Sequence, residues 1–171
     1  MRVRPATIAD AAAITAIYNE GIASRQATLD TELRTVEEME RRIADAYEGH
    51  AWLVATDESE PGDPVVAWAA TMPYSSRAAY DGVAEFSIYV AGAHQGRGAG
   101  RLVLAALLAE GERSGLHKVT SRIFTDNAAS RGLCASLGFR EVGVHLRHGL
   151  LDGRWRDVVT VEILLGAAAA D

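Results

Sequence analysis

Gln95-Gly96-Arg97-Gly98-Ala99-Gly100 decides the fold, because it stands between an apolar segment ending at Val90 and an apolar helical pattern beginning near Arg101. Its three glycines allow a tight turn and leave backbone N–H groups open to a ligand. The run 102–109 predicts a buried helix whose first turn carries unpaired N–H donors. Arg97 and Arg101 oppose the helix dipole there, and a bound anion would offset that cost. The segment predicts a diphosphate-binding loop; a plain glycine turn with solvated arginines is the alternative.

Two familiar phosphate motifs do not fit this loop. A Walker loop needs Gly-Lys followed by Ser or Thr, and the one lysine, Lys118, lies elsewhere in the chain. A dinucleotide-binding fingerprint needs a third glycine where Arg101 stands, and it belongs to an opening strand–helix–strand unit. The loop is therefore expected to hold a diphosphate in another kind of fold.

Composition limits the class of protein. A chain of 171 residues with 49% hydrophobic residues can bury one sizeable core. A net charge of −6 argues against a nucleic-acid partner, since phosphates attract a basic face. No apolar run reaches the ~20 residues of a membrane span. The single cysteine, Cys134, and the absence of a signal-peptide pattern indicate a cytoplasmic protein.

Apolar periodicity predicts one α/β domain over residues 1–165 and a flexible tail, 166–171. Capping-box pairs, Thr7 with Asp10 and Thr35 with Glu38, predict two early helices separated by a loop at 24–33. Met39, Ile43 and Ala46 are expected to form the apolar stripe of the second helix. The expected strands are 3–5, 50–56, 65–72, 83–90, 119–124, 142–147 and 158–165. Two later helices are expected, one beginning near residue 101 and one spanning 128–137.

The glycine loop and several other segments carry a family resemblance. Gln95-x-x-Gly98-x-Gly100 after a strand resembles the acyl-CoA loop of the GNAT family of N-acetyltransferases. The other matching segments cover nearly the whole chain: Ile17-Tyr18-Asn19-Glu20-Gly21-Ile22, Glu85-Phe86-Ser87-Ile88-Tyr89-Val90, Asn127-x-x-Ser130, Leu137-Gly138-Phe139 and Asp152-Gly153-Arg154-Trp155-Arg156-Asp157-Val158. They are similar to the phosphinothricin and arsinothricin N-acetyltransferase branch.

The resemblance implies the GNAT fold, a mixed α/β sheet whose two central parallel strands splay apart to admit acetyl-CoA. It assigns the diphosphate to the loop and the pantetheine arm to the backbone of one splayed strand, the Asn127 amide and Ser130. In a simpler interpretation, Asp126 and Asn127 form a turn into a helix. The residues expected at the cofactor are therefore Ile88, Tyr89, Val90, Gln95, Gly96, Arg97, Gly98, Ala99, Gly100, Arg101, Asn127 and Ser130.

Glu85 is the expected catalytic residue. A carboxylate within a central strand is costly unless it is paired or functional. Acetylation of an ammonium needs a proton acceptor, and in the resembled branch this position is the proposed general base. The alternative is a structural glutamate paired with an arginine such as Arg77.

Cys134 departs from the family pattern, because many members place tyrosine or histidine there to protonate the departing thiolate. Arsinothricin-type relatives also carry cysteine at this position. A CoA thiolate is a tolerable leaving group that can take its proton from water. Cys134 is therefore interpreted as a small buried hydrophobe, and no acid is assigned.

Substrate selection is expected in the loops near Glu85. Arg77 would suit a carboxylate or phosphinate, whereas relatives often carry a second arginine where Ser75 and Ser76 stand here. Each of these side chains could equally be ordinary surface. The substrate-binding candidates are Tyr18, Thr28, Tyr74, Arg77 and Tyr80.

The five histidines show no spacing that gathers metal ligands, so no metal is predicted. His145-x-x-His148 could form a strand-end pair, and solvated side chains are the favoured interpretation. Trp155 and Asp157 match the C-terminal segment that supports the fold and, in relatives, a homodimer.

The expected function is acetyl transfer from acetyl-CoA to the α-amino group of a small amino-acid analogue, with phosphinothricin or arsinothricin favoured and methionine sulfoximine or sulfone close alternatives. Two further alternatives stay open: acetylation of a peptide N-terminus or lysine, and a non-catalytic acyl-CoA-binding module.

Overall fold

The computed structural model describes residues 1–169, so the end of the expected tail, 170–171, lies outside the described residues. Within them the strands form one seven-stranded sheet in the order β1-β2-β3-β4-β5-β7-β6. The strands are β1 (Arg2–Pro5), β2 (Trp52–Thr56), β3 (Val65–Pro73), β4 (Val83–Val90), β5 (Lys118–Phe124), β6 (Arg140–Leu151) and β7 (Arg154–Leu164). The α-helices are α1 (Ala11–Ser24), α2 (Val36–Ala44), α3 (Ala99–Arg113) and α4 (Ala128–Ser136).

The expected α/β class and the order of elements are confirmed, with local corrections. Helix α2 ends at Ala44, so Ala46 lies outside it and is exposed, whereas Met39 and Ile43 are buried as expected. The expectation that α3 is buried along its length is wrong at Leu102, which is 41% exposed. Strands β6 and β7 extend well beyond their predicted ranges, and Gly166–Ala169 form a short 3-10 helix. These differences lie at element ends and on exposed faces, where periodicity carries least information.

Capping fixes the start of both early helices. The Thr35 hydroxyl accepts from the Glu38 backbone N–H at 3.2 Å, and the Glu38 carboxylate accepts from the Thr35 N–H at 3.1 Å. Before α1, the Asp10 carboxylate accepts from the Thr7 N–H at 2.8 Å and from Arg4 in two bonds of 2.7 Å. The Arg4 guanidinium lowers the pKa of Asp10 to about 2. Helix α1 is thereby held to the first strand.

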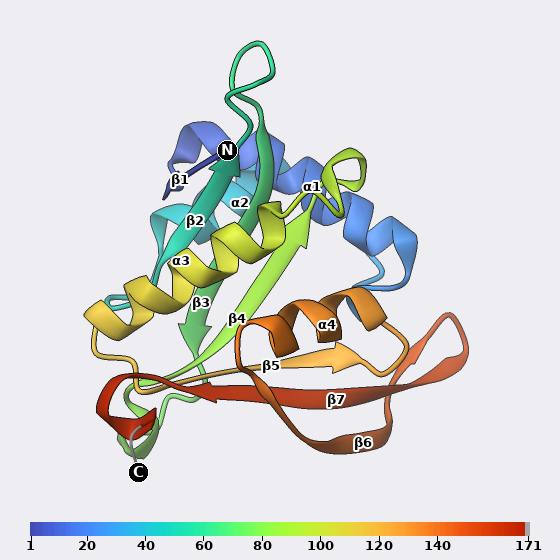
Figure 1. Ribbon diagram of the computed structural model, residues 1–171. Helices are drawn as coiled ribbons and strands as arrows, with labels where there is room; N and C mark the ends of the chain where they lie inside the picture. Colours follow the sequence, from blue (N-terminus) through green and yellow to red (C-terminus); the bar gives the residue numbers. More distant parts are fainter. Residues whose placement is uncertain (170–171) are drawn as a thin grey trace.

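Two layers of helices sandwich the sheet (Figure 1). Helix α3 contributes Val103, Leu104 and Leu107 to the larger core, which also contains Cys134 of α4. On the opposite face, α1 and α2 pack over an aromatic stack in which Trp68 lies 5.3 Å from Trp52 and 5.0 Å from Tyr89. No helix among the described residues has both the length and the apolar character needed to cross a membrane.

The central parallel strands, β4 and β5, separate after a short shared stretch. Their pairing covers Val83–Glu85 against Lys118–Thr120 and then stops. The outer edge of β4 stays paired with β3 up to Val90, and the outer edge of β5 stays paired with β7 up to Phe124. Figure 1 shows the two strands diverging from a common start, β4 toward the loop before α3 and β5 beneath α4. The splayed pair expected from the sequence is therefore present.

Candidate active site

A cavity of about 310 Å³ lies where β4 and β5 part, and we call it the gap cavity. Its walls come from both splayed strands, from α4, from the loop after α1 and from β6. The lining residues are Ala27, Thr28, Leu29, Phe86, Ser87, Ile88, Tyr89, Ser121, Arg122, Ile123, Phe124, Asn127, Ser130, Cys134, His148 and Val158. Of the expected site residues, the structure brings Thr28, Ile88, Tyr89, Asn127 and Ser130 together here.

The glycine loop ends at the amino terminus of α3, where Gly98 is the N-cap. Gly96 and Gly98 have φ angles of +74° and +89°, which disfavour side chains, and an added Cβ would meet nothing within 4 Å at either position. Gly100 is needed for another reason, because a Cβ there would lie 3.2 Å from Val90 and 3.3 Å from Leu133. Thus two glycines shape an open loop, and the third lets α3 pack closely against β4 and α4.

The two cations of this loop differ in their surroundings. Arg97 is 55% exposed and lies 3.6 Å from the Glu60 carboxylate in the β2–β3 connection. Arg101 is exposed and has no ion-pair partner within 4.0 Å among the described residues. Gln95 and Gly96 are exposed, whereas Ala99 is buried beneath the loop. The loop therefore presents two accessible guanidinium groups beside the open backbone of α3.

Glu85 points to the α1 and α2 side of β4, and its carboxylate accepts a hydrogen bond from Arg122 of β5 at 2.5 Å. The alternative of a glutamate paired with an arginine is therefore met in kind, but the partner is Arg122 of β5 and not Arg77. The Glu85 side chain is 24% exposed and lies just outside the gap cavity.

Asn127 caps α4 and joins it to the loop after α1. Its side-chain oxygen accepts from the Ser130 N–H at 3.0 Å, and its amide donates to the Gln26 carbonyl at 3.0 Å. Asn127 is therefore both the turn residue of the simpler interpretation and part of the wall of the gap cavity.

Cys134 lies in the wall of the gap cavity and is only 1% exposed. Burial raises the pKa of its thiol to about 12. Such a thiol holds its proton more tightly than a CoA thiol near the reference value of ~8.5, so it is a poor donor to a departing thiolate. The burial of Cys134 agrees with its interpretation as a small hydrophobic residue of the core.

Two of the substrate candidates flank the aromatic stack beside the cavity. Tyr18 is 8% exposed, packs edge-on against Tyr89 at 4.8 Å and donates from its hydroxyl to Asp30 at 2.7 Å. Burial and the neighbouring Asp30 raise the pKa of Tyr18. Thr28 accepts from the Asp30 N–H at 3.1 Å and lines the gap cavity. Tyr18 is thus a core residue that supports the loop containing Thr28.

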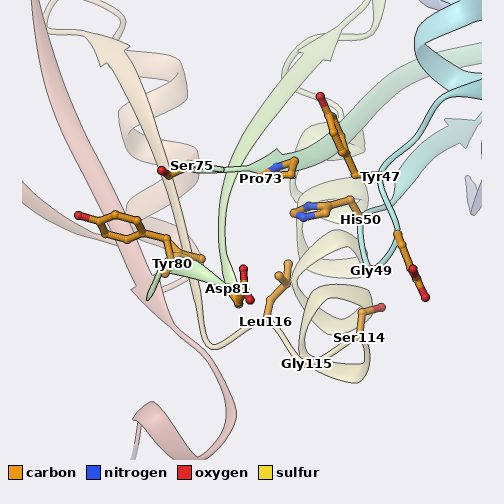
Figure 2. Close-up of a pocket in the computed structure, with 13 residues that line it drawn as sticks. Tyr47, Gly49, His50, Pro73, Ser75, Tyr80, Asp81, Ser114, Gly115 and Leu116 are labelled. Carbon is orange, nitrogen blue, oxygen red and sulfur yellow. The ribbon is translucent and has the colours of Figure 1, made fainter. Parts of the chain in front are cut away.

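The other three candidates lie at the opposite end of β4 from the glycine loop. Tyr74 and Tyr80 form an edge-on pair 5.3 Å apart in the β3–β4 connection, and Arg77 between them is exposed. Tyr80 lines a separate cavity of about 410 Å³, shown in Figure 2, with Tyr47 and His50 across from it. These residues are not brought together with the gap cavity.

A third cavity, of about 550 Å³, is rich in arginine, and we call it the arginine cavity. Its lining includes Arg34, Arg41 and Arg42, the carboxylates Glu38 and Asp45, and Met72. Met72 is the register partner of Glu85 across β3 and β4, so this cavity begins beside the expected catalytic residue. Nε of Arg34 is buried without a hydrogen-bond partner in the described part of the chain. Sequence spacing missed this group, because its members converge only through the packing of α2 on the sheet.

Comparison with known proteins now identifies the family. The model of the acetyltransferase (GNAT) domain matches residues 1–140. The chain belongs to the GNAT family of acetyltransferases. The L-methionine sulfoximine/L-methionine sulfone acetyltransferase of Salmonella typhimurium is 35% identical, covering 99% of this chain and 98% of that protein. The phosphinothricin N-acetyltransferase of Streptomyces coelicolor is 31% identical, covering 95% of each.

A GNAT phosphinothricin acetyltransferase from Sinorhizobium meliloti, solved in complex with acetyl-CoA, superposes with a TM-score of 0.91 at 29% identity, covering 99% of this chain and 91% of that one. The chain is an acetyl-CoA-dependent N-acetyltransferase. The open glycine loop, its two accessible cations and the divergent inner edges of β4 and β5 fit this cofactor. The alternative of a non-catalytic binding module is thereby set aside.

Two histidines of this acetyltransferase, His94 and His148, lie in surroundings that their spacing in the sequence did not predict. Although their spacing predicted no metal group, the fold brings ligand atoms of Asp57, Glu60 and His94 within 4.8 Å of one another. Several of their polar atoms already have protein partners, since Asp57 accepts from the Ser59 hydroxyl at 2.6 Å and His94 Nε2 lies 3.0 Å from Glu60, whereas His94 Nδ1 is buried without a partner among the described residues. His148 is exposed, as the interpretation of solvated side chains expects, and it also lines the gap cavity.

Replacing Gly98 by Ala is expected to weaken acetyl-CoA binding about tenfold, because a side chain disfavours the left-handed backbone of the loop by ~1–2 kcal/mol. Calorimetric titration with acetyl-CoA measures this. Gly153→Ala is the matched control: its φ is +75°, an added Cβ also meets nothing within 4 Å, and it lies in the β6–β7 turn. Equal loss of affinity in both variants would show that the loop does not hold the cofactor.

Proposed function

We propose that this acetyltransferase acetylates the α-amino group of a small amino-acid analogue, with phosphinothricin, arsinothricin, or methionine sulfoximine and sulfone as the candidate substrates. The observation that carries the proposal is the parting of β4 and β5 around a cavity beside Glu85. The names of the relatives support the substrate class.

The cofactor is proposed to span the glycine loop and the gap. Backbone N–H groups from Gln95 to Arg101 hold the diphosphate, with the Arg97 and Arg101 guanidinium groups beside it. The inner edge of β4 at Ile88, Tyr89 and Val90 is free of β5, which leaves backbone groups for the pantetheine amides. Asn127 and Ser130 line the far side of the cavity.

Acetyl-CoA supplies an acetyl group activated as a thioester. Glu85, directly or through a water, accepts a proton as the amine nitrogen attacks, and backbone N–H groups around Val90 polarise the carbonyl. In the observed geometry Glu85 is paired with Arg122, so the carboxylate is already oriented toward the inner edge of β5. Fixing both reactants at one point supplies much of the rate enhancement.

The arginine cavity supports an anionic acceptor. It holds three guanidinium groups against two carboxylates and begins beside Met72, the neighbour of Glu85. Arg34 is bound to Asp30 at 2.6 Å, and Arg41 Nε donates to the Glu37 carbonyl at 3.2 Å, whereas Arg42 has neither an ion-pair partner within 4.0 Å nor a side-chain hydrogen bond among residues 1–169. Arg42 is therefore the guanidinium most available to the α-carboxylate or phosphinate of an acceptor. A peptide acceptor would instead need an open acidic groove.

We further propose a cytoplasmic homodimer. Strand β6 is the edge of the sheet, and its Val142, Val144 and Leu146 side chains are 49%, 53% and 75% exposed. Trp155 on β7 is 59% exposed. An unpaired edge with this much apolar surface is a template for a second copy of the chain. The free thiol of Cys134 suits a reducing compartment.

The first test is acetyl-CoA turnover, followed as free-thiol release, with phosphinothricin, arsinothricin, methionine sulfoximine, methionine sulfone and a peptide panel. Turnover confined to the amino-acid analogues is expected, and Glu85→Gln should lower kcat by about 10²-fold or more. Glu141→Gln, which also removes a carboxylate paired with an arginine, is the control. Turnover of the peptides alone would contradict the proposed acceptor class.

A second test separates two candidate anion-binding arginines. Arg42→Gln should raise KM for the acceptor about tenfold or more, since a hydrogen bond to a charged group contributes ~1.5–3 kcal/mol. KM for acetyl-CoA should stay unchanged. Arg77→Gln is the comparison, and an effect confined to Arg77 would move the acceptor site to the β3–β4 connection.

A third test addresses the proposed dimer. Sedimentation of the wild-type chain should give twice the mass of one chain, and Leu146→Asp should shift it toward the monomer because a charge would be buried in the interface. Leu164→Asp, at a residue 43% exposed on the far end of β7, is the control. A wild-type monomer at micromolar concentration would contradict the proposal.

A further inference from the structure

The gap cavity contains four titratable side chains, and they differ in their ability to exchange a proton near neutral pH. They are Tyr89, Arg122, Cys134 and His148. Burial raises the pKa of Tyr89, and burial raises the pKa of the Cys134 thiol to about 12. The Arg122 guanidinium offers hydrogen-bond donors and no acceptor, so it cannot take a proton from an amine. A neutral imidazole carries a nitrogen lone pair that can accept a proton, so His148 is the member suited to this task.

Glu85 leaves room for a second proton acceptor. Its carboxylate oxygen Oε1 already accepts a hydrogen bond from Arg122 at 2.5 Å. Glu85 also lies outside the lining of the gap cavity, whereas His148 borders it directly. A group that takes a proton from the acceptor amine must come within hydrogen-bond reach of the nitrogen in this cavity.

A local distortion of β6 places His148 at the cavity. The pairing of β6 with β7 shifts register between His145 and Gly149, so the intervening residues bulge from the ladder. Within the bulge Arg147 has a φ of +52°, which is uncommon for a residue other than glycine. Its N–H donates to the Asp157 carboxylate at 2.6 Å, which holds this conformation. Strained backbone of this kind persists where the surrounding structure fixes it and gathers at functional sites.

The loop after α1 confirms which way the bulge faces. A Cβ on Gly149 would lie 2.5 Å from Leu29, so the bulge and that loop are in close contact. Leu29 and Thr28 line the gap cavity together with His148. His148, which is exposed, therefore borders the gap cavity beside the loop after α1.

We infer that His148 is the residue that accepts the proton of the acceptor ammonium in the gap cavity. The inference rests on the proposed function and adds a catalytic residue to it. The ammonium gives one proton to the imidazole, and the freed lone pair forms the new C–N bond. The nitrogen then gives its second proton to Glu85, directly or through a water. The C–S bond breaks with its electron pair on sulfur, which takes that proton from Glu85 and leaves as the CoA thiol. The imidazolium then returns its proton to water.

The test compares His148→Ala and His148→Gln with the wild-type chain in steady-state turnover. Both variants should lower kcat by about 10²-fold with little change in KM for acetyl-CoA, because a proton acceptor acts in the chemical step. Added imidazole should restore part of the activity of His148→Ala. His145→Ala is the matched control, since its ring lies 4.9 Å from that of His148 but bonds to Thr160 and does not line the cavity.

An acceptor with a neutral nitrogen distinguishes proton acceptance from substrate positioning. With an aminooxy analogue, which is unprotonated at neutral pH, the loss in His148→Ala should shrink to less than about tenfold. An equal loss with both acceptors, or full activity of both variants, overturns the inference. Failure of the wild-type chain to acetylate any acceptor overturns the proposed function, and the inference with it. Unfolding midpoints within a few degrees of wild type exclude a folding defect.

Discussion

The separation of β4 and β5 is the constraint on which the site depends. Each strand is held by its outer neighbour along nearly its whole length, β4 by β3 and β5 by β7, so the two can part without losing their place in the sheet. Parting leaves polar groups of the inner edges without ladder partners, which is unfavourable inside a protein unless something else bonds them. Ser121 does this for one group, donating from its hydroxyl to the Phe86 carbonyl at 3.0 Å. A ligand that carries amide groups is suited to form hydrogen bonds with the other unpaired backbone groups of these two inner edges.

The helices keep this gap from collapsing. Gly100 lets the first turn of α3 approach Val90 at the end of β4, which puts the amino terminus of the helix beside the open strand edge. On the other side, Phe139 after α4 packs 5.3 Å from Phe86, so the wall below the cavity is aromatic and tightly filled. Close packing on both sides makes the gap a fixed feature of the fold, which is what orientation of two reactants requires.

The sequence predicted the fold and the glycine loop before α3 well, because their signals are local. Alternating apolar residues, capping pairs and glycines act over a few positions, and the Thr35–Glu38 box is found as expected. The surroundings of side chains depended on contacts between distant segments. Arg122, 37 positions from Glu85, meets it only because β5 pairs with β4. Tyr18 has an aromatic ring like a binding residue, but the packing of α1 turns it into the core.

The spacing of the histidines in the sequence could not predict that His148 lines the gap cavity, because its position depends on a bulge in β6. The bulge that turns it toward the cavity contains Arg147 in a left-handed conformation, and no glycine or asparagine marks that position. The conformation is imposed by Asp157 on the neighbouring strand, a contact that exists only once β6 and β7 have paired. The same Asp157 belongs to the C-terminal segment that carried the family resemblance. A residue that supports the strand pairing can thus also orient a side chain in the site, which links the long β6–β7 hairpin to the chemistry at the gap.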